Sequence, residues 1–484
     1  MRDRPIYVPV NLLQSIFITA ILLVFLQFDV SGDMYCQYRY YGIIAILGYV
    51  WIFFSNSKRL SNKINLFLVF IALTIPFYFG GQILILLGYG AKLADERYSL
   101  VDGRVGMQYN IAAMKYIIIS LRCLNIGYQF RRNNRDSQKK FRNAESTFSA
   151  DDQSAAINLV ATILIIVAAV PTIVRLGYDI SVAKAIGHLA YLHEKSEDSY
   201  MGIWFAMSYI QGWFLPACYM KLVCGKPKGK RIIYILLAIY MILYLMTGSR
   251  YEIIQIAFAI FVINTYTSDK KIRLRDIIIF IVIGYIAIVI LRSVSYTRDV
   301  TGSGLSLSSI ANVLGGNVLY ECLFETSTTF TSISNTIMHV PSTIYYNCGK
   351  SILGAFNYIL PAFLRISPLN NIVLQLSSKL SPLYYGYSGA GYGSSFLTES
   401  YFNYGFFSPC IMLFFGYFLN LLTSRLAYFS INNDKRKFII SLYIMTELVW
   451  AIRQDMYLIP RHLVYYILIP LVISSLLAKR RKKG

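Results

Sequence analysis

Long apolar runs recur along the whole chain and alternate with short polar segments that hold most of the charge. Apolar runs of this kind are typical of helices that cross a hydrocarbon layer about 30 Å thick. The first run lacks a small-residue cleavage site, so it predicts a retained span rather than a signal peptide. The sequence predicts twelve spans, at residues 10–28, 40–55, 64–89, 109–130, 154–176, 201–223, 232–247, 251–267, 277–294, 402–422, 438–452 and 457–477.

Basic residues gather in every second connector between these spans. The alternation follows the rule that cytoplasmic connectors carry an excess of Lys and Arg, and it predicts that both termini are cytoplasmic. The net charge of +22 therefore reports the orientation of the chain, and the sequence predicts no nucleic-acid partner. The basic segments are Arg2 with Arg4, then residues 58–63, 131–142, 221–231, 270–275, 425–437 and 479–483.

Two polar features interrupt this regular pattern. The fourth predicted span contains Lys115 and Arg122, which are costly inside a membrane unless they are paired or face a wet cavity. After the fifth span, residues 182–193 have an amphipathic pattern that predicts a separate helix lying in the membrane interface.

Composition supports one all-α polytopic membrane domain that comprises the whole chain, residues 1–484. Hydrophobic residues make up 56% and charged residues 14% of the chain, and the mean hydropathy is +0.51, which excludes a soluble enzyme. The seven cysteines have no metal-ligand spacing, and neither a paired-histidine motif nor a glycine-rich phosphate loop is present. The sequence therefore predicts no metal site and no cofactor.

One long interval, residues 292–401, separates the ninth predicted span from the tenth. It is too aromatic and too poor in charge for a disordered segment, and long ordered connections are usually functional. Its main part, residues 295–400, is predicted to form an extracytoplasmic cap over a reaction site. Tyrosines and glycines are interleaved between Tyr384 and Gly405, a composition suited to stacking on sugar rings. An aromatic belt at the membrane interface explains some of these tyrosines.

Five arginines come close to the predicted outer ends of spans, where the positive-inside rule disfavours them. A guanidinium group binds phosphate oxygens in a bidentate manner and stays charged, so several of them together suit a lipid-linked diphosphate. Two alternatives stay open. Arg250 can instead extend its side chain to lipid headgroups. Asp455 can form an ion pair with Arg453 or Arg461 that only stabilises the turn. The arginines are Arg250, Arg292, Arg298, Arg453 and Arg461.

A transfer reaction also needs a general base, and Glu399 is the best candidate, because it lies in a segment crowded with Gly and Tyr directly before a span. Glu321 and Glu325 are four residues apart and share one face if that segment is helical. Such pairs serve acid–base chemistry in glycoside hydrolases, although a solvated helix face is the favoured explanation here. Glu325 and His339 are therefore kept as substrate-binding candidates, with His339 as a third possible base.

Two short motifs resemble bacterial O-antigen and capsular repeat-unit polymerases of the Wzy type, within the O-antigen polymerase and ligase superfamily. They are Thr247-Gly248-Ser249-Arg250 in an outward turn, and Thr398-Glu399-Ser400-Tyr401-Phe402-Asn403-Tyr404-Gly405 before a span. The number of spans and the long outward loop fit the same plan. The resemblance implies an all-helical fold like that of C-type glycosyltransferases, located in the bacterial cytoplasmic (inner) membrane.

The resemblance also implies a reaction. A growing glycan is transferred from undecaprenyl pyrophosphate to a lipid-linked repeat unit on the outer face of the membrane, without metal. Arg250 would bind the pyrophosphate, and Glu399, Tyr401 and Asn403 would lie at the sugar-binding rim. Related ligases use a loop histidine as base, but His339 has no supporting motif here, so Glu399 is preferred. Membrane lipid, a chain-length regulator and a flippase are the implied partners.

Two other functions are compatible with a chain of this kind. An O-antigen ligase performs the same chemistry on a different acceptor, and the sequence alone does not separate it from a polymerase. A flippase for lipid-linked oligosaccharides also has about twelve spans, but it needs two similar halves around a central cavity. This chain has one large loop and no similarity between its halves, which disfavours the flippase.

Overall fold

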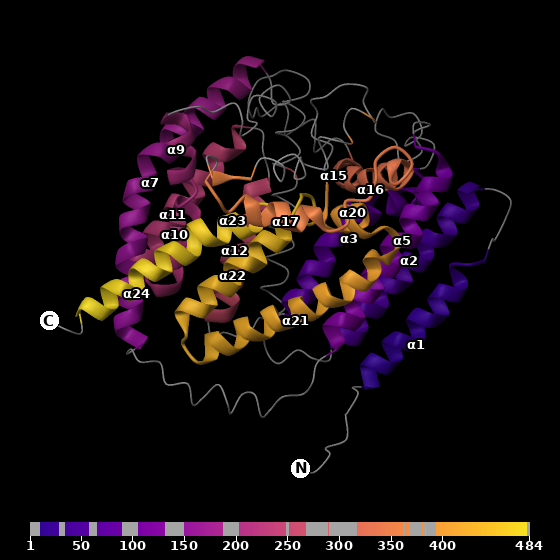
Figure 1. Ribbon diagram of the computed structural model, residues 1–484, viewed down its shortest axis with the longest axis horizontal. Coiled ribbons are helices and arrows are strands. Elements are labelled where there is room, and N and C mark those ends of the chain that lie inside the picture. Colours follow the sequence, from indigo (N-terminus) through magenta and orange to yellow (C-terminus); the bar gives the residue numbers. More distant parts are fainter. Residues whose placement is uncertain are drawn as a thin grey trace, which may run out of the picture.

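The computed structural model describes most of the chain, and all regular elements among its described residues are helices (Figure 1). The described residues are 10–28, 34–57, 65–89, 105–130, 150–186, 203–247, 251–267, 317–361, 364–366 and 394–481, together with 289, 380 and 383. The prediction of an all-α protein is thus confirmed for this part of the chain.

The described helices have the following bounds. In the first part of the chain they are α1 (Val10–Phe25), α2 (Met34–Ser57), α3 (Leu66–Leu86), α5 (Met107–Gln129), α7 (Ala150–Ile186), α9 (Ile203–Gln211), α10 (Phe214–Cys224), α11 (Pro227–Leu245) and α12 (Tyr251–Thr267). Later in the chain they are α15 (Val318–Thr326), α16 (Thr328–His339), α17 (Lys350–Asn357), α20 (Phe396–Tyr404), the 3-10 helix η3 (Gly405–Phe407), α21 (Ser408–Ile431), α22 (Lys435–Trp450), α23 (Ile459–His462), the π-helix η4 (Leu463–Leu468) and α24 (Ile469–Arg481).

Within the described part of the chain, five helical stretches are long and apolar enough to cross a membrane, by length and composition. They are Leu66–Leu86, Met107–Gln129, Asp152–Val182, Phe396–Ile431 and Ile459–Arg480. Two shorter apolar helices are Asn11–Phe25 and Glu252–Thr267. These stretches support a multi-pass membrane protein. The number of twelve spans stays a prediction, and the ninth predicted span, residues 277–294, lies outside the described residues except for position 289.

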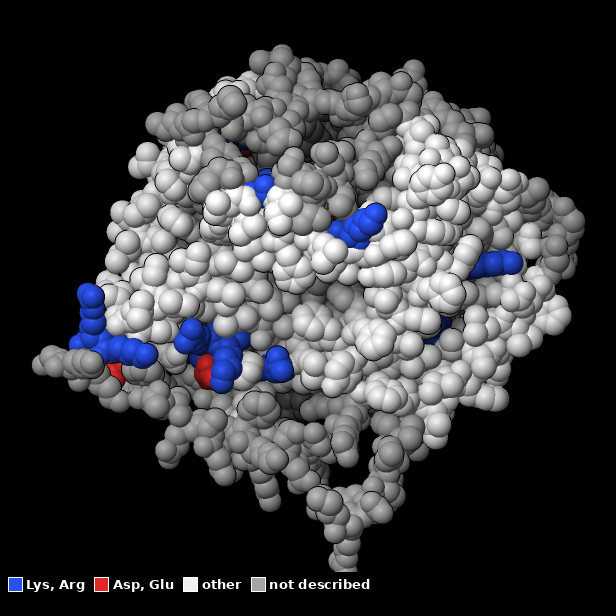
Figure 2. Space-filling model, viewed as in Figure 1, with Lys and Arg blue, Asp and Glu red and all other residues white. Residues whose placement is uncertain are grey.

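The described surface also has the character of a membrane protein. Outward-facing side chains of α7 include Ile166, Val170 and Ile173, each at least 64% exposed. Figure 2 shows a broad uncharged surface on one face, with Lys and Arg gathered near the α21–α22 turn and the C-terminal end of α24. Because exposed apolar side chains of this extent are unfavourable in water, lipid is the solvent that suits this surface.

Helices α5 and α21 are far apart in the sequence but pack directly against each other (Figure 1). A Cβ atom added at Gly127 would lie 1.9 Å from the carbonyl oxygen of Leu413, and one at Gly416 would lie 1.9 Å from that of Leu124. The two glycines therefore allow the helix backbones to touch. Small residues at such crossings are typical of membrane helices, whose association depends on close van der Waals packing.

Arg122, one of the two charges in the fourth predicted span, is only 2% exposed on α5. Its guanidinium donates to Thr19 Oγ1 at 3.2 Å, to the carbonyl oxygen of Ser15 at 3.4 Å and to that of Gly48 at 3.5 Å. These acceptors lie on α1 and α2, so one side chain joins three helices. Lys115 lies over an aromatic ring of α2, 5.0 Å from its centre. Both charges thus have partners on neighbouring helices, which explains how α5 holds them.

Two predicted elements differ from the structure. Helix α7 continues without a break to Ile186, so residues 182–186 extend it instead of beginning a separate interfacial helix, and residues 187–193 lie outside the described part. The predicted span 201–223 is divided into α9 and α10 at Gly212. A Cβ atom at Gly212 would lie 2.2 Å from Cζ of Tyr466, so the tyrosine ring packs into this break.

The interval predicted as a cap contains three described helices, α15, α16 and α17. Helix α15 packs on α3, and α16 packs on α3, α5 and α20. In Figure 1 these helices lie toward the end of the molecule opposite to the α21–α22 turn. The interval is therefore helical where it is described, and its position on the outer side of the membrane stays a prediction.

Candidate functional site

Helix α20 carries three of the predicted site residues in one short buried element. The Ser395 hydroxyl accepts the Thr398 backbone N–H at 3.1 Å and caps the N-terminus of the helix. Gly405 ends the helix with a φ of 56°, a backbone conformation that L side chains rarely adopt. These two signals limit α20 to a single short segment directly before α21.

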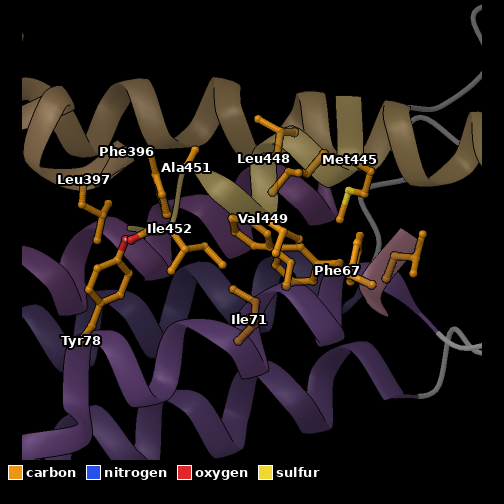
Figure 3. Packing of buried hydrophobic residues seen from close by; sticks show 14 of the residues in the cluster. Phe67, Ile71, Tyr78, Phe396, Leu397, Met445, Leu448, Val449, Ala451 and Ile452 are labelled. Carbon is orange, nitrogen blue, oxygen red and sulfur yellow. The ribbon is translucent and has the colours of Figure 1, made fainter. Parts of the chain in front are cut away.

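The Glu399 side chain projects from α20 toward the turn between α22 and α23. Its Oε2 atom accepts the backbone N–H of Met456 at 2.8 Å, and the residue is 6% exposed. This turn, residues 451–458, is also held from its other side. The Phe396 N–H donates to the Ala451 carbonyl oxygen at 2.8 Å, and Tyr78 Oη donates to that of Ile452 at 3.2 Å (Figure 3).

Arg453 lies in the turn that Glu399 holds. Its guanidinium lies 6.0 Å from the ring centre of Phe77 on α3. The structure therefore places Glu399 and Arg453 at the same turn, two predicted site residues that are 54 positions apart in the sequence. A carboxylate that accepts a backbone N–H of an arginine-bearing turn fixes the position of that turn.

Asn403 and Tyr401 connect α20 to its neighbours. The Asn403 amide donates to Ser351 Oγ at 2.7 Å and accepts the Gly349 N–H at 3.0 Å, so it binds the N-terminal end of α17. The Tyr401 ring is buried and contacts the Tyr116 ring edge to face, with centres 5.2 Å apart. Both side chains thus contribute to the packing around Glu399, and their contact with sugar stays a prediction.

A second polar cluster includes His462, the residue that follows Arg461. Arg461 is 5% exposed on α23, and its guanidinium lies 4.6 Å from the ring centre of Tyr209 on α9. The next residue, His462, has its Nδ1 atom 3.2 Å from Glu447 Oε2 on α22. Gln255 Nε2 on α12 donates to the other carboxylate oxygen, Oε1, also at 3.2 Å.

The sequence analysis did not assign a role to Glu447, Gln255 or His462. Glu447 is the only charged residue in the predicted span 438–452, and an ionisable group inside a span is itself a signal of function. Gln255 has no comparable signal, because an uncharged amide near a helix end is ordinary. Only the packing of α12, α22 and α23 brings the three side chains together.

The remaining predicted residues are placed as follows. His339 lies at the end of α16, where Nδ1 is 3.2 Å from Thr343 Oγ1, and partial burial lowers the pKa of its imidazole. The backbone of Glu325 belongs to α15, but its side chain is outside the described residues, as are residues 384–393 of the tyrosine–glycine segment. Arg250, Arg292 and Arg298 also lie outside the described residues.

The residues that flank Arg250 are described on both sides. Thr247 is buried at the end of α11, and its hydroxyl donates to the Tyr244 carbonyl oxygen at 2.8 Å. Glu252, in the first turn of α12, accepts a hydrogen bond from the Tyr244 hydroxyl. The two ends of the predicted turn are therefore tied together, next to α12, which also carries Gln255.

Among the described residues, no group of three or more His, Cys, Asp or Glu side chains is arranged to hold a metal ion. None of the seven cysteines, all of which lie in the described part of the chain, forms a disulfide bond.

Comparison with known families identifies the chain. A family model described as O-antigen polysaccharide polymerase Wzy matches residues 12–483, nearly the whole chain. The protein belongs to the Wzy O-antigen polymerase family. No curated protein and no solved structure matches it. The resemblance predicted from two short motifs is thus confirmed, and with it the general assignment to O-antigen repeat-unit polymerisation in a multi-pass membrane protein.

Membership in the Wzy family also indicates a glycosyltransferase type of activity on lipid-linked oligosaccharide repeat units. It does not assign roles to individual residues.

Proposed function

We propose that this Wzy-family protein extends a polysaccharide on the outer face of the bacterial cytoplasmic membrane. It transfers the growing glycan from undecaprenyl pyrophosphate to a lipid-linked repeat unit, and both of its termini are cytoplasmic. The match of the family model to residues 12–483 carries this proposal. An all-helical fold resembling the C-type glycosyltransferases, with a cap over residues 295–400, is part of the same proposal.

In the proposed reaction, a hydroxyl oxygen of the acceptor sugar attacks the anomeric carbon of the donor glycan. The bond between this carbon and the pyrophosphate oxygen breaks, and its electron pair leaves with undecaprenyl pyrophosphate. The charge on the departing group is stabilised by guanidinium groups, which need no metal ion. Those proposed are Arg250, Arg292, Arg298, Arg453 and Arg461.

The attacking hydroxyl must lose its proton, and we propose that Glu399 is the general base that accepts it. Its place beside the Arg453 turn supports this role, because acceptor and leaving group must meet at one carbon. To act as the base, the buried Glu399 carboxylate must accept a hydrogen bond from the acceptor hydroxyl. It does so either in place of the Met456 N–H or in addition to it. Tyr401 and Asn403 are proposed at the sugar-binding rim, with Glu325 and His339 as further contacts in the cap.

Arg250→Ala and Arg250→Lys test the pyrophosphate role. Both are expected to abolish chain extension, because lysine keeps the charge but loses the planar fork that binds two phosphate oxygens. Complementation of a deletion strain, with ladder analysis of the surface polysaccharide and a blot for membrane-inserted protein, provides the measurement. Long chains from either variant would exclude the proposed role of Arg250.

The same strain separates the polymerase from its alternatives. A polymerase defect leaves a single repeat unit attached to its acceptor, whereas a ligase defect leaves none and a flippase defect traps repeat units inside. A deletion phenotype with no attached repeat unit would replace the proposed polymerase with the ligase. Co-purification tests the proposed association with a flippase and a chain-length regulator.

A further inference from the structure

A buried carboxylate lies where three helices meet, outside the set of residues used in the proposed mechanism. Glu447 on α22 has a side chain that is 7% exposed. One of its carboxylate oxygens accepts a hydrogen bond from Gln255 Nε2 of α12 at 3.2 Å. The other lies 3.2 Å from His462 Nδ1 of α23. A buried carboxylate is expensive unless it is hydrogen-bonded and paired with a positive charge.

The only group of this cluster that can supply a positive charge is the His462 imidazole. As an imidazolium it donates through Nδ1 to Glu447, and its second N–H, at Nε2, is left as a charged donor. No hydrogen bond from Nε2 to another described residue is found, and the His462 side chain is 25% exposed. The carboxylate is thus enclosed, while the far side of the imidazole is accessible.

The backbone around His462 is irregular and closely held. His462 is directly followed by the π-helix Leu463–Leu468, a rare element that is frequent at functional sites. The Tyr466 ring lies 5.4 Å from the imidazole and fills the break at Gly212. Trp213 Nε1 donates to the Tyr465 carbonyl oxygen at 3.2 Å. These contacts fix the imidazole relative to α9, the helix whose Tyr209 lies under Arg461.

We propose that His462 is a further ligand for the lipid-linked diphosphate, next to Arg461, with its imidazolium balanced by Glu447. This inference rests on the proposed function, because it names a contact to the same substrate. Arg461 and His462 are adjacent on the short helix α23, so the chain brings a guanidinium and an imidazole, both able to donate charged hydrogen bonds, to the same segment. Glu447 is a positioning residue in this arrangement, since it touches the imidazole and not the ligand.

The test uses the purified full-length protein in detergent and inorganic pyrophosphate as the probe, followed by titration calorimetry. His462→Ala is expected to weaken pyrophosphate binding about tenfold, the usual effect of losing one charge-assisted hydrogen bond. His462→Gln keeps an N–H donor without the charge and is expected to lose less. Lys437→Ala is the matched control, because it removes one positive charge at the α21–α22 turn, and its binding is expected to be unchanged.

Several outcomes overturn the inference. Unchanged pyrophosphate binding by a His462→Ala protein with an unaltered thermal midpoint would reduce the Glu447–His462 pair to a structural link between helices. If the unsubstituted protein does not bind pyrophosphate detectably, the proposed role of His462 as a diphosphate ligand also fails. A loss of turnover number with an unchanged KM for lipid-linked repeat unit would instead make His462 a proton acceptor.

Failure of this inference is distinguishable from failure of the proposed function. If His462→Ala binds pyrophosphate normally while the deletion strain accumulates single attached repeat units, only the inference fails. If His462 supports pyrophosphate binding but the deletion strain has the ligase phenotype, the diphosphate ligand stands and the polymerase assignment fails.

Discussion

Buried charged side chains of this protein are each held by a different kind of partner. Arg122 donates only to neutral oxygens of α1 and α2, whereas Glu447 faces an imidazole and an amide. Glu399 accepts the backbone N–H of Met456, which lies in the turn between α22 and α23. Polar groups away from water need partners of this kind. Arg122 therefore serves the assembly of helices, whereas Glu399 contacts the turn that carries Arg453 and Glu447 contacts His462, the residue next to Arg461.

Replacement of Glu399 by Gln tests its role as a base. The amide oxygen of Gln can still accept the Met456 N–H, so the turn is expected to keep its position, but an amide does not take up a proton. Loss of a general base reduces turnover by about 10²–10⁴-fold. We therefore expect repeat-unit transfer, measured with lipid-linked substrate in vitro, to fall by about this factor.

Asp434→Asn is the control for this experiment. Asp434 pairs with Lys437 on the α21–α22 turn, where its loss is expected to leave transfer unchanged. If Glu399→Gln kept normal transfer and Glu399→Ala did not, the carboxylate would be an anchor for the 451–458 turn rather than a base.

At the scale of elements, the close contact between α5 and α21 positions the candidate site. Helix α21 continues directly from α20 through the short η3 segment, so its packing on α5 determines where α20 lies. Tyr116 of α5 strengthens this placement, because its hydroxyl donates to the Leu397 carbonyl oxygen at 2.9 Å. The two glycines at the crossing are therefore as important for the site as the polar residues that it contains.

Gly416→Ala is expected to destabilise the protein strongly. The added Cβ atom would lie 1.9 Å from the Leu124 carbonyl oxygen, a rigid backbone atom, so α21 must move away from α5. Overpacking of a close contact typically costs about 1–3 kcal/mol. The thermal midpoint of the purified protein in detergent measures the effect.

Gly177→Ala provides the comparison. A Cβ atom at Gly177 on α7 meets nothing within 4 Å, and alanine favours a helix more than glycine does. We expect an equal or higher thermal midpoint for this variant. Equal midpoints for the Gly416 and Gly177 variants would show that the α5–α21 backbones are farther apart than in the structure.

At the scale of the whole molecule, two groups of basic residues lie away from the cap helices, although Figure 2 also shows Lys and Arg elsewhere on this face. Basic residues gather near the α21–α22 turn and the end of α24, whereas α15, α16 and α17 lie toward the other end (Figures 1 and 2). The positive-inside rule therefore predicts that the cap helices face away from the cytoplasm. A site on the outer face stays a prediction of this orientation, and the Glu399 contact to the 451–458 turn and the Asn403 contact to α17 would lie on that side.

Cysteine labelling of spheroplasts tests the orientation. In a background without the seven native cysteines, Tyr345→Cys in the cap is expected to react with a membrane-impermeant maleimide in intact spheroplasts, since Tyr345 is 87% exposed. Lys437→Cys is expected to react only after lysis. The reverse pattern would place the cap in the cytoplasm and exclude an outer-face reaction site there.

The sequence by itself determined the class of protein. Long apolar runs, alternating basic connectors and two short motifs were enough for an all-helical membrane protein of the Wzy family, because these features depend on solvent and local pattern. It also selected Glu399 and Arg453 as candidates, which the structure places at one turn. The start of a separate helix at residue 182 was wrong, because α7 continues to Ile186, and the break at Gly212 within the predicted span 201–223 was not foreseen. Neither the continuity of α7 nor the neighbouring ring at Gly212 is visible in the local sequence pattern.

Only the tertiary structure decided which distant side chains meet. Glu447, Gln255 and His462 come from three helices, and no spacing in the sequence relates them. The contact of α5 with α21 depends on two glycines that are 289 positions apart. A glycine within a span does not indicate by itself which other helix it contacts. Such contacts arise from the packing of complete helices, which is why they could not be derived from the order of residues.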